Sequence, residues 1–208
     1  VINPQFGGAS MADTDPHIFR AMLGLLLALN LGISGYHRGR ARSEETIPRS
    51  AETQSVRLAR VAFALPGMLL LLAYVIHPPL VAWSSLPVPL WSRWFGVLVG
   101  LVAAPLNIWV LSSLGKNVSE TVLTKTNHEL VTGGPYRWVR HPLYTFNFIM
   151  LGGLSLVAAN WLMAVLTVGA VVLFSVVIIP LEEVELAKKF GNRYRDYQTR
   201  TGCLLPRM

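Results

Sequence analysis

The chain has 208 residues, of which 52% are hydrophobic and 14% are charged. Soluble domains carry about 25% charged residues, so the composition excludes an ordinary soluble protein and indicates one embedded in a membrane. The net charge of +7 is compatible with nucleic acid or lipid, and among so many apolar runs we attribute it to Lys and Arg gathered on the cytoplasmic side. We therefore expect membrane lipids as partners, and no nucleic acid.

The N-terminal part begins with ten residues that precede Met11, and we expect residues 1–10 to be a vector-derived remnant outside the fold. The first apolar run predicts a membrane span over residues 18–36, because about 20 helical residues cross the hydrocarbon core. An Arg-rich segment then begins at residue 37 and reaches Arg57 and Arg60. We expect this segment to be cytoplasmic, which places the N-terminus outside.

Two further spans are predicted over residues 58–76 and 90–114. The segment between them, residues 77–89, has four prolines and no Lys, Arg, Asp or Glu, so we expect an external loop. Residues 11–114 therefore form a unit of three N-terminal transmembrane helices.

The second unit, residues 115–208, begins with a polar cytoplasmic segment and continues with two spans over residues 142–157 and 161–180. A tight turn joins these spans into a hairpin, so both of its other ends lie on the cytoplasmic side. The tail from residue 181 begins as an amphipathic helix. The predicted fold is thus an all-α integral membrane protein with about five transmembrane helices, a C-terminal amphipathic helix and a cytoplasmic cofactor-binding loop.

Three polar features converge on the cytoplasmic face of this second unit, which we interpret as the catalytic region. They are the loop 128–136, the Arg140-His141-Pro142-Leu143-Tyr144 segment, and the Glu182-Glu183 pair. Because the two spans form a hairpin, we expect Arg140 and His141 to face Glu182 and Glu183.

The chemistry of these groups favours a cofactor with an amino acid end and an adenosine end. Pro142 suits the first turn of a helix, whose amide groups and dipole bind an anionic group. A carboxylate such as Glu182 suits an ammonium, and the apolar walls suit a nucleobase. No GxGxxG sequence follows a predicted strand, which excludes a Rossmann domain. The single cysteine, Cys203, excludes a disulfide within the chain and a cysteine metal cluster, and we predict no metal site.

Other classes of protein remain open on these residues. A transporter subunit or scaffold more often carries charges inside its spans, and residues 95–114 and 142–180 have none. A membrane reductase with a nicotinamide cofactor fits the Glu pair and Phe190-Gly191 less well.

In these residues the chain resembles the isoprenylcysteine carboxyl methyltransferase family, which is related to the phospholipid N-methyltransferases. The matching pieces lie in the family's order and are His128-x-Leu-Val-x-x-Gly-x-Tyr136, Arg140-His-Pro-x-Tyr144, Glu182-Glu183-x-x-Leu186, Phe190-Gly191, Tyr194, Tyr197 and Pro206.

The resemblance implies a methyltransferase dependent on S-adenosylmethionine that acts on a lipophilic acceptor. The acceptor classes left open are a prenylcysteine, a lipid amine and a small thiol. The family often has an arginine where this chain has Ile178, and an apolar side chain cannot pair with a substrate carboxylate. By position, the resemblance assigns cofactor contacts to His128, Glu129, Leu130, Val131, Tyr136, His141, Pro142, Leu143, Tyr144 and Glu182.

Two residues are candidates for the catalytic step. Arg140 can position a carboxylate nucleophile, and Glu183 can serve as a base for an amine that must lose its proton. Such a protein belongs in the plasma membrane of a prokaryote, which the Ala/Leu/Val-rich composition favours, or in the endoplasmic reticulum of a eukaryote.

Overall fold

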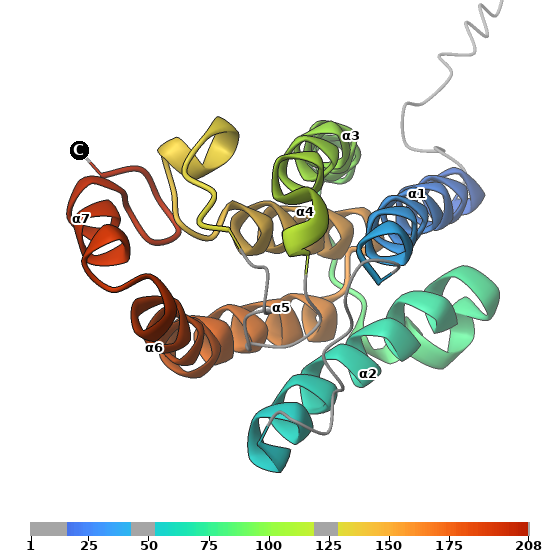
Figure 1. The fold of residues 1–208 in the computed structure, drawn as a ribbon. Coiled ribbons are helices and arrows are strands. Elements are labelled where there is room, and N and C mark those ends of the chain that lie inside the picture. Colours follow the sequence, from blue (N-terminus) through green and yellow to red (C-terminus); the bar gives the residue numbers. More distant parts are fainter. Residues whose placement is uncertain (1–15, 43–52, 119–128, 208) are drawn as a thin grey trace, which may run out of the picture.

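The computed structural model describes residues 16–42, 53–118 and 129–207 (Figure 1). Within these ranges the chain is helical, with isolated β-bridges but no strand. Residues 1–10 and His128 lie outside the described residues. In chain order, the helices and helical turns are α1 (Pro16–Arg42), α2 (Gln54–Ile76), η2 (Pro78–Ser84), α3 (Leu90–Leu114), η3 (Gly115–Asn117), η4 (Gly134–Arg137), α4 (Pro142–Ala158), α5 (Trp161–Leu173), η5 (Phe174–Ile178), α6 (Ile179–Phe190) and α7 (Asn192–Arg200).

Four helical segments among the described residues are long and apolar enough to cross a membrane. They are His17–Ala41, Gln54–Ile76, Leu90–Asn117 and Trp161–Phe190, while the apolar α4 is shorter. At 17 residues, α4 is about 26 Å long, just under the thickness of a hydrocarbon core. The all-α membrane fold is therefore confirmed, and the predicted count of about five spans includes this one short helix.

The last long segment continues past the predicted end at residue 180, because Pro180 is accommodated rather than ending the helix. Proline has no amide N–H to donate to the carbonyl four residues earlier. Directly before it, η5 (Phe174–Ile178) is a π-helical turn, and α6 begins at Ile179. Such a wider turn is a common way to pass a disrupted hydrogen-bond ladder. It carries the Glu182-Glu183 pair on a helix that is continuous with α5.

The closest helix packing is between α3 and α4, where two glycines face each other. A Cβ atom built on Gly96 would lie 2.6 Å from the carbonyl oxygen of Gly153. Small residues allow this close approach of two backbones, which is typical of helix pairs in membranes. The pairing fixes the position of α4, whose first turn carries His141 and Tyr144.

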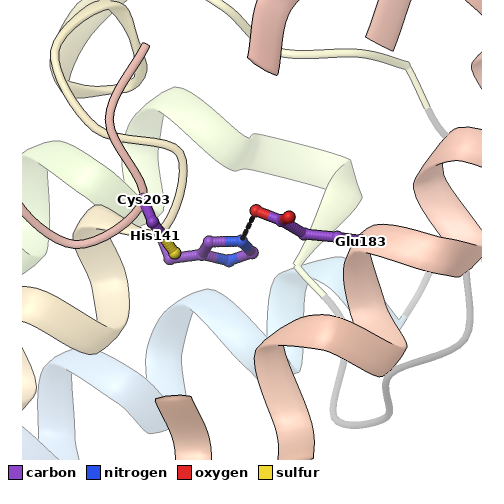
Figure 2. Close-up of side chains that lie close together, drawn as sticks. All are labelled: His141, Glu183 and Cys203. Carbon is purple, nitrogen blue, oxygen red and sulfur yellow. Dashed lines mark hydrogen bonds and ion pairs between the residues drawn. The ribbon is translucent and has the colours of Figure 1, made fainter. Parts of the chain in front are cut away.

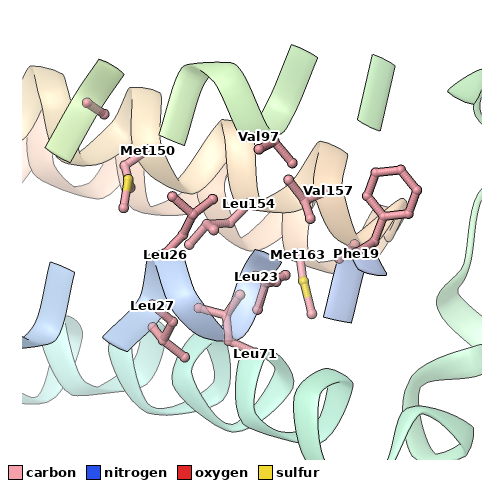
Figure 3. Close-up of a cluster of buried hydrophobic side chains, with 12 residues drawn as sticks. Phe19, Leu23, Leu26, Leu27, Leu71, Val97, Met150, Leu154, Val157 and Met163 are labelled. Atoms are coloured by element: carbon pink, nitrogen blue, oxygen red, sulfur yellow. The ribbon is translucent and has the colours of Figure 1, made fainter. Parts of the chain in front are cut away.

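The buried core lies between α1, α3 and α4 (Figure 3). Phe19, Leu23 and Leu26 of α1 contact it from one side, and Leu154 of α4 is almost completely buried within it. Helix α2 contributes Leu71 to the same core. Side chains of these four helices, with Met163 of α5, therefore form one apolar cluster that holds the bundle together.

One end of the bundle is closed by contacts between the loop after α2 and the turn after α4. The amide of Leu86 donates to the carbonyl of Ala159 over 2.7 Å. The Asn160 amide group donates to Ser84 Oγ at 2.7 Å, and its oxygen caps α5 by accepting from the amide of Met163. The predicted external loop and hairpin turn thus share one end, opposite to the polar residues.

Candidate functional site at the polar ends of the hairpin

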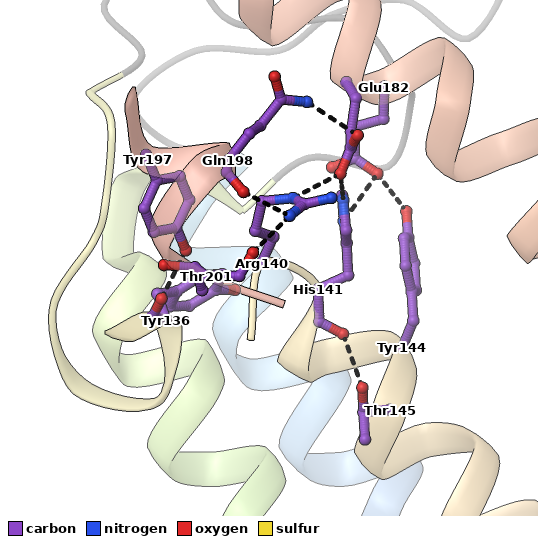
Figure 4. Close-up of polar contacts among 10 residues, drawn as sticks. Tyr136, Arg140, His141, Tyr144, Thr145, Glu182, Tyr197, Gln198 and Thr201 are labelled. Atoms are coloured by element: carbon purple, nitrogen blue, oxygen red, sulfur yellow. Dashed lines mark hydrogen bonds and ion pairs between the residues drawn. The ribbon is translucent and has the colours of Figure 1, made fainter. Parts of the chain in front are cut away.

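The first turn of α4 and the start of α6 meet through an arginine, a histidine and a glutamate (Figure 4). Arg140 Nε donates to Glu183 Oε1 at 2.7 Å, and His141 Nε2 lies 3.1 Å from the same oxygen. Both charged side chains are shielded, with 13% of Arg140 and 17% of Glu183 exposed. The predicted meeting of Arg140 and His141 with the Glu pair is confirmed.

The second glutamate of the pair contacts the other side of the imidazole. Glu182 Oε2 accepts a hydrogen bond of 2.8 Å from the Tyr144 hydroxyl and lies 3.8 Å from His141 Nδ1. The rings of His141 and Tyr144 are stacked, with centroids 5.7 Å apart. His141 is therefore held between two carboxylates and a phenol ring.

An aromatic group adjoins this polar cluster on the side of the hydrocarbon core. The Tyr144 ring meets the ring of Phe174 edge-on at 5.0 Å, and Phe148 packs on both. These three rings come from α4 and from the π-helical turn. A polar cluster beside an apolar aromatic wall suits an amphiphilic ligand.

The C-terminal tail completes the site by binding the residues that precede α4. The amides of Arg140 and His141 donate to the carbonyls of Gly202 and Cys203 at 2.8 and 3.1 Å. Arg140 Nη1 donates to the carbonyls of Gln198 and Thr201. The Gln198 amide donates to Glu183 Oε2 at 2.9 Å. Glu183 thus receives donors from the loop and from α7.

The electrostatics of the groups outside the spans follow from burial and from Glu183. Burial by itself would lower the pKa of Arg140, but the hydrogen bond and charge of Glu183 raise it, so the guanidinium stays charged. Burial raises the pKa of the Cys203 thiol, and the charge of Glu183 raises it further. Burial also raises the pKa of Tyr136 well above its usual range.

Three potential metal ligands meet in this cluster, namely His141, Glu183 and Cys203 (Figure 2). Their ligand atoms all lie within 4.8 Å of one another. Glu183 Oε1 already accepts from the Arg140 guanidinium, so a cation at that oxygen would have to displace a positive charge. The cluster therefore works first as an ion pair with a buried imidazole.

The remaining predicted cofactor residues lie in different surroundings. Glu129 is exposed and pairs with Lys116 at 2.6 Å. Leu130 and Val131 are half-buried. Leu143 packs against the apolar cluster of Ala41, Leu111 and Val118. Pro142 is buried at the first position of α4. Tyr136 is buried, and its carbonyl accepts a hydrogen bond from the Tyr197 hydroxyl.

The tail residues Gln198, Thr201 and Cys203 were missed by the sequence analysis, which gave them no part in the site. The sequence feature that could have indicated them is Gly202, which follows Thr201 directly after the tail helix and marks a turn. A Cβ atom on Gly202 would lie 1.8 Å from the carbonyl oxygen of Leu205, so this turn requires glycine.

The fold and the site together define a multi-pass integral membrane protein with a polar site at one end of a helix hairpin. Residues 96–188 match the model of the isoprenylcysteine carboxyl methyltransferase family. Protein-S-isoprenylcysteine O-methyltransferase A of Arabidopsis thaliana is 32% identical over 149 residues, which are 70% of this chain and 74% of that protein. The chain belongs to the isoprenylcysteine carboxyl methyltransferase family.

Other relatives differ in name and in length. The nickel-cobalt-cadmium resistance protein NccN of Alcaligenes xylosoxydans xylosoxydans is 36% identical over 80 residues, 38% of this chain and 37% of that protein. A solved eukaryotic intramembrane Ras methyltransferase of the family shares the fold with a TM-score of 0.57, at 22% identity over 94% of this chain and 69% of its own. The chain spans 37% to 44% of the length of several curated relatives that it matches.

Proposed function

We propose that this chain is a methyltransferase dependent on S-adenosylmethionine, and that it methylates a lipophilic acceptor at the cytoplasmic face of the membrane. The observation that carries the proposal is the enclosure of Arg140 and His141 by Glu182 and Glu183 at the hairpin ends. Membership of the family supports it.

The donors and acceptors of this site fit the cofactor. Glu182 offers a carboxylate to an ammonium, and the first turn of α4 has amide groups without helical acceptors for a carboxylate. The Tyr194 hydroxyl is buried without a hydrogen-bond partner among the described residues. When bound, S-adenosylmethionine supplies an electrophilic methyl group on a sulfonium. Tyr136, His141, Pro142, Leu143, Tyr144 and Glu182, with residues 128–131, remain the proposed contacts.

Within this proposal the residues of the chain align the acceptor and exclude water. Arg140 and Glu183 are the proposed catalytic residues. Glu183 accepts hydrogen bonds from Arg140 and Gln198 and contacts His141, and such donors stabilise its ionised form and weaken it as a base. This arrangement favours an acceptor that needs little deprotonation, such as a carboxylate, over an ammonium.

The acceptor that we propose to test first is therefore the carboxylate of a prenylcysteine. The names of several relatives, protein-S-isoprenylcysteine O-methyltransferase, support this choice. The cytoplasmic leaflet of a prokaryotic plasma membrane is the proposed location, since the basic segments lie at the site's end of the hairpin.

Calorimetric titration of the detergent-purified chain with S-adenosylhomocysteine tests the cofactor assignment. We expect saturable binding by the wild type and none by Glu182→Ala. Glu185→Ala is the matched control, because Glu185 lies on the same helix and pairs with Lys188 on its exposed face. A folded wild type that binds NADPH but not S-adenosylhomocysteine would favour a reductase instead.

Transfer of a radiolabelled methyl group to a panel of acceptors then tests the reaction. The panel contains a prenylcysteine, an aminophospholipid and a lipophilic thiol. Labelling of at least one of them is the expected result, and labelling of none by a protein that binds the cofactor would contradict the proposed activity.

A further inference from the structure

Three side chains of different types meet at the polar end of the hairpin, and together they offer a nitrogen, an oxygen and a sulfur atom (Figure 2). They are His141 before α4, Glu183 on α6 and Cys203 in the C-terminal tail, and their potential ligand atoms lie within 4.8 Å of one another. Zinc binds imidazole nitrogen, carboxylate oxygen and thiolate sulfur at about 2.0–2.3 Å in a tetrahedron, which places neighbouring ligand atoms about 3.5 Å apart. A set of this kind needs only one cysteine, and its widest separation has to close by no more than about 1.3 Å.

The groups around His141 and Glu183 orient them as the neighbours of a zinc site do. His141 Nε2 faces Glu183 Oε1 at 3.1 Å, and Nδ1 on the other side of the ring lies 3.8 Å from Glu182 Oε2. A histidine that binds zinc commonly directs its second ring nitrogen at a carboxylate, which fixes the ring and strengthens it as a ligand. The Gln198 amide donates to the other oxygen of Glu183 at 2.9 Å and holds this carboxylate in place. Each of the two ligands thus has a second partner that can stay in place when a metal ion binds.

The Arg140 guanidinium is the group that competes with a metal ion, because Arg140 Nε donates to Glu183 Oε1 at 2.7 Å. Its Nη1 atom also donates to the carbonyls of Gln198 and Thr201. Arg140 therefore keeps two acceptors when a cation takes the carboxylate oxygen, and its charge is not left without a partner. The guanidinium and a metal ion are thus alternative partners of one oxygen atom.

We propose that His141, Glu183 and Cys203 form a binding site for one thiophilic divalent cation such as zinc. On binding, the metal ion forms bonds to the imidazole nitrogen, to a carboxylate oxygen and to the sulfur, and the Cys203 thiol releases its proton to water. The carboxylates of Glu182 and Glu183 and the thiolate then carry three negative charges, which balance the cation and Arg140. A water molecule completes the tetrahedron.

Metal binding at this place would act against the proposed methyl transfer. His141 is a proposed contact of the cofactor and Glu183 is a proposed catalytic residue, so a bound zinc ion and S-adenosylmethionine would compete. Zinc should therefore inhibit the reaction rather than assist it. This consequence rests on the proposed function, while the metal site itself rests on the three ligands and their neighbours.

Titration of the chelator-treated, detergent-purified chain with cobalt(II) tests the site by its absorption spectrum. Cobalt(II) takes the place of zinc in tetrahedral sites, and a cobalt–thiolate bond absorbs in the near ultraviolet. We expect this band to saturate at one cobalt ion per chain and to disappear when zinc is added. Magnesium requires octahedral oxygen ligands and should leave the band unchanged. Because Cys203 is the single cysteine, the band reports on this residue alone.

Variants of the ligands assign the metal ion to the cluster. Cys203→Ser should abolish the band and lower zinc affinity about a hundredfold or more, because losing even an outer partner of a metal ligand costs about 10- to 100-fold. Glu183→Gln should lower zinc affinity at least about tenfold. His77→Gln is the matched control, because His77 is an exposed histidine that follows α2 at the opposite end of the bundle.

Alkylation of Cys203 in the wild type gives a second measurement that does not depend on how Glu183→Gln folds. Zinc should slow the reaction with iodoacetamide at least about tenfold, because a metal-bound thiolate is not free to attack. A wild type without the cobalt–thiolate band, whose alkylation rate zinc leaves unchanged, would overturn the metal site. A folded Glu183→Gln with the wild-type band and affinity would also overturn it, since the cysteine would then bind the metal ion without the cluster.

Titration with S-adenosylhomocysteine in the presence of zinc separates the metal site from the proposed function. With zinc at ten times its dissociation constant, the apparent cofactor affinity of the wild type should fall about tenfold. The cofactor affinity of Cys203→Ser should be the same with and without that zinc. A wild type that binds no S-adenosylhomocysteine would contradict the methyltransferase proposal, while the cobalt band still decides whether the metal site exists.

Discussion

The imidazole of His141 and the carboxylate of Glu183 lie 3.1 Å apart although 42 positions separate them in the sequence. The contact exists because α4 and α5 form a hairpin whose turn, at Ala159, has a left-handed backbone conformation with φ 49°. Arg140 donates to the same Glu183 oxygen, and the tail binds Arg140 in turn. One carboxylate thus connects α4, α6 and the C-terminal tail.

The ion pair between Arg140 and Glu183 predicts a large effect of removing either partner. Glu183→Ala should lower the free energy of unfolding by about 3 kcal/mol, because breaking a shielded pair leaves a charge without its partner. Thermal denaturation in detergent measures the change. In a double-mutant cycle, the loss in Glu183→Ala/Arg140→Ala should be clearly smaller than the sum of the single losses. Additive losses would mean that the two side chains do not stabilise each other.

The close contact between α3 and α4 predicts that an added Cβ atom clashes at Gly96 of α3 and meets open space at Gly152 of α4. Gly96→Ala should lower the melting temperature, because its Cβ atom would lie 2.6 Å from backbone and the helices must separate. Gly152→Ala is the matched control on α4, since nothing lies within 4 Å of its Cβ position. Alanine is favoured over glycine in a helix by about 1 kcal/mol, so this control should be neutral or stabilising. Equal melting temperatures for both variants would contradict the close packing.

Much of the bundle could be predicted from hydrophobicity, because lipid requires long apolar helices. The bounds of α3 agree with the predicted 90–114, since Pro89 precedes its first residue and Gly115 follows its last. The fifth span was predicted to end at Pro180 with an amphipathic helix after it, and in the structure the two are one continuous helical segment. The accommodation of this proline by a π-helical turn depends on the hydrogen-bond ladder around it and has no clear signature in sequence.

The candidate site was predictable where it depends on the hairpin, and less so where it depends on the tail. Arg140, His141 and the Glu pair were placed together because hairpin ends are neighbours. Gln198, Thr201 and Cys203 reach the site through a chain reversal at Gly202, which hydrophobic periodicity does not reveal. The place predicted for Glu129 depended on resemblance, and in the structure this residue pairs with Lys116.

The turn at Gly202 predicts that the tail can be released without unfolding the bundle. In Gly202→Ala the Cβ atom would meet the Leu205 carbonyl, so the turn must open and its hydrogen bonds to Arg140 and His141 should be lost. Two hydrogen bonds of about 1 kcal/mol each order the loop before α4, so cofactor affinity should fall about tenfold or more. The readouts are titration with S-adenosylhomocysteine and the melting temperature. Gly32→Ala, with nothing within 4 Å of its Cβ position, is the control. Unchanged affinity in a folded Gly202→Ala would show that the tail does not order the site.

The Cys203 thiol reports on the charge of Glu183, and it is the single cysteine of the chain. Burial raises its pKa, and the negative charge of Glu183 raises it further, so the thiol stays protonated at a pH where an unfolded cysteine ionises. Iodoacetamide reacts with the thiolate. The pH midpoint of the alkylation rate should therefore be higher in the folded chain than in the unfolded chain, whose midpoint should lie near the ordinary cysteine pKa of about 8.5.

The raised pKa of Cys203 also determines how stability depends on pH and in which direction a variant at Glu183 should move the alkylation midpoint. The folded state holds the Cys203 proton more tightly than the unfolded state does, so the protonated thiol contributes to the stability of the fold. This contribution is complete below the pKa of the unfolded cysteine and is lost as the pH rises through the pKa of the folded one. Glu183→Gln removes the negative charge, so the alkylation midpoint should move to lower pH, while Glu185→Gln on the exposed face should leave it unchanged. A midpoint equal to that of the unfolded chain in the wild type, or one unmoved by Glu183→Gln, would contradict the placement of Cys203 beside the carboxylate.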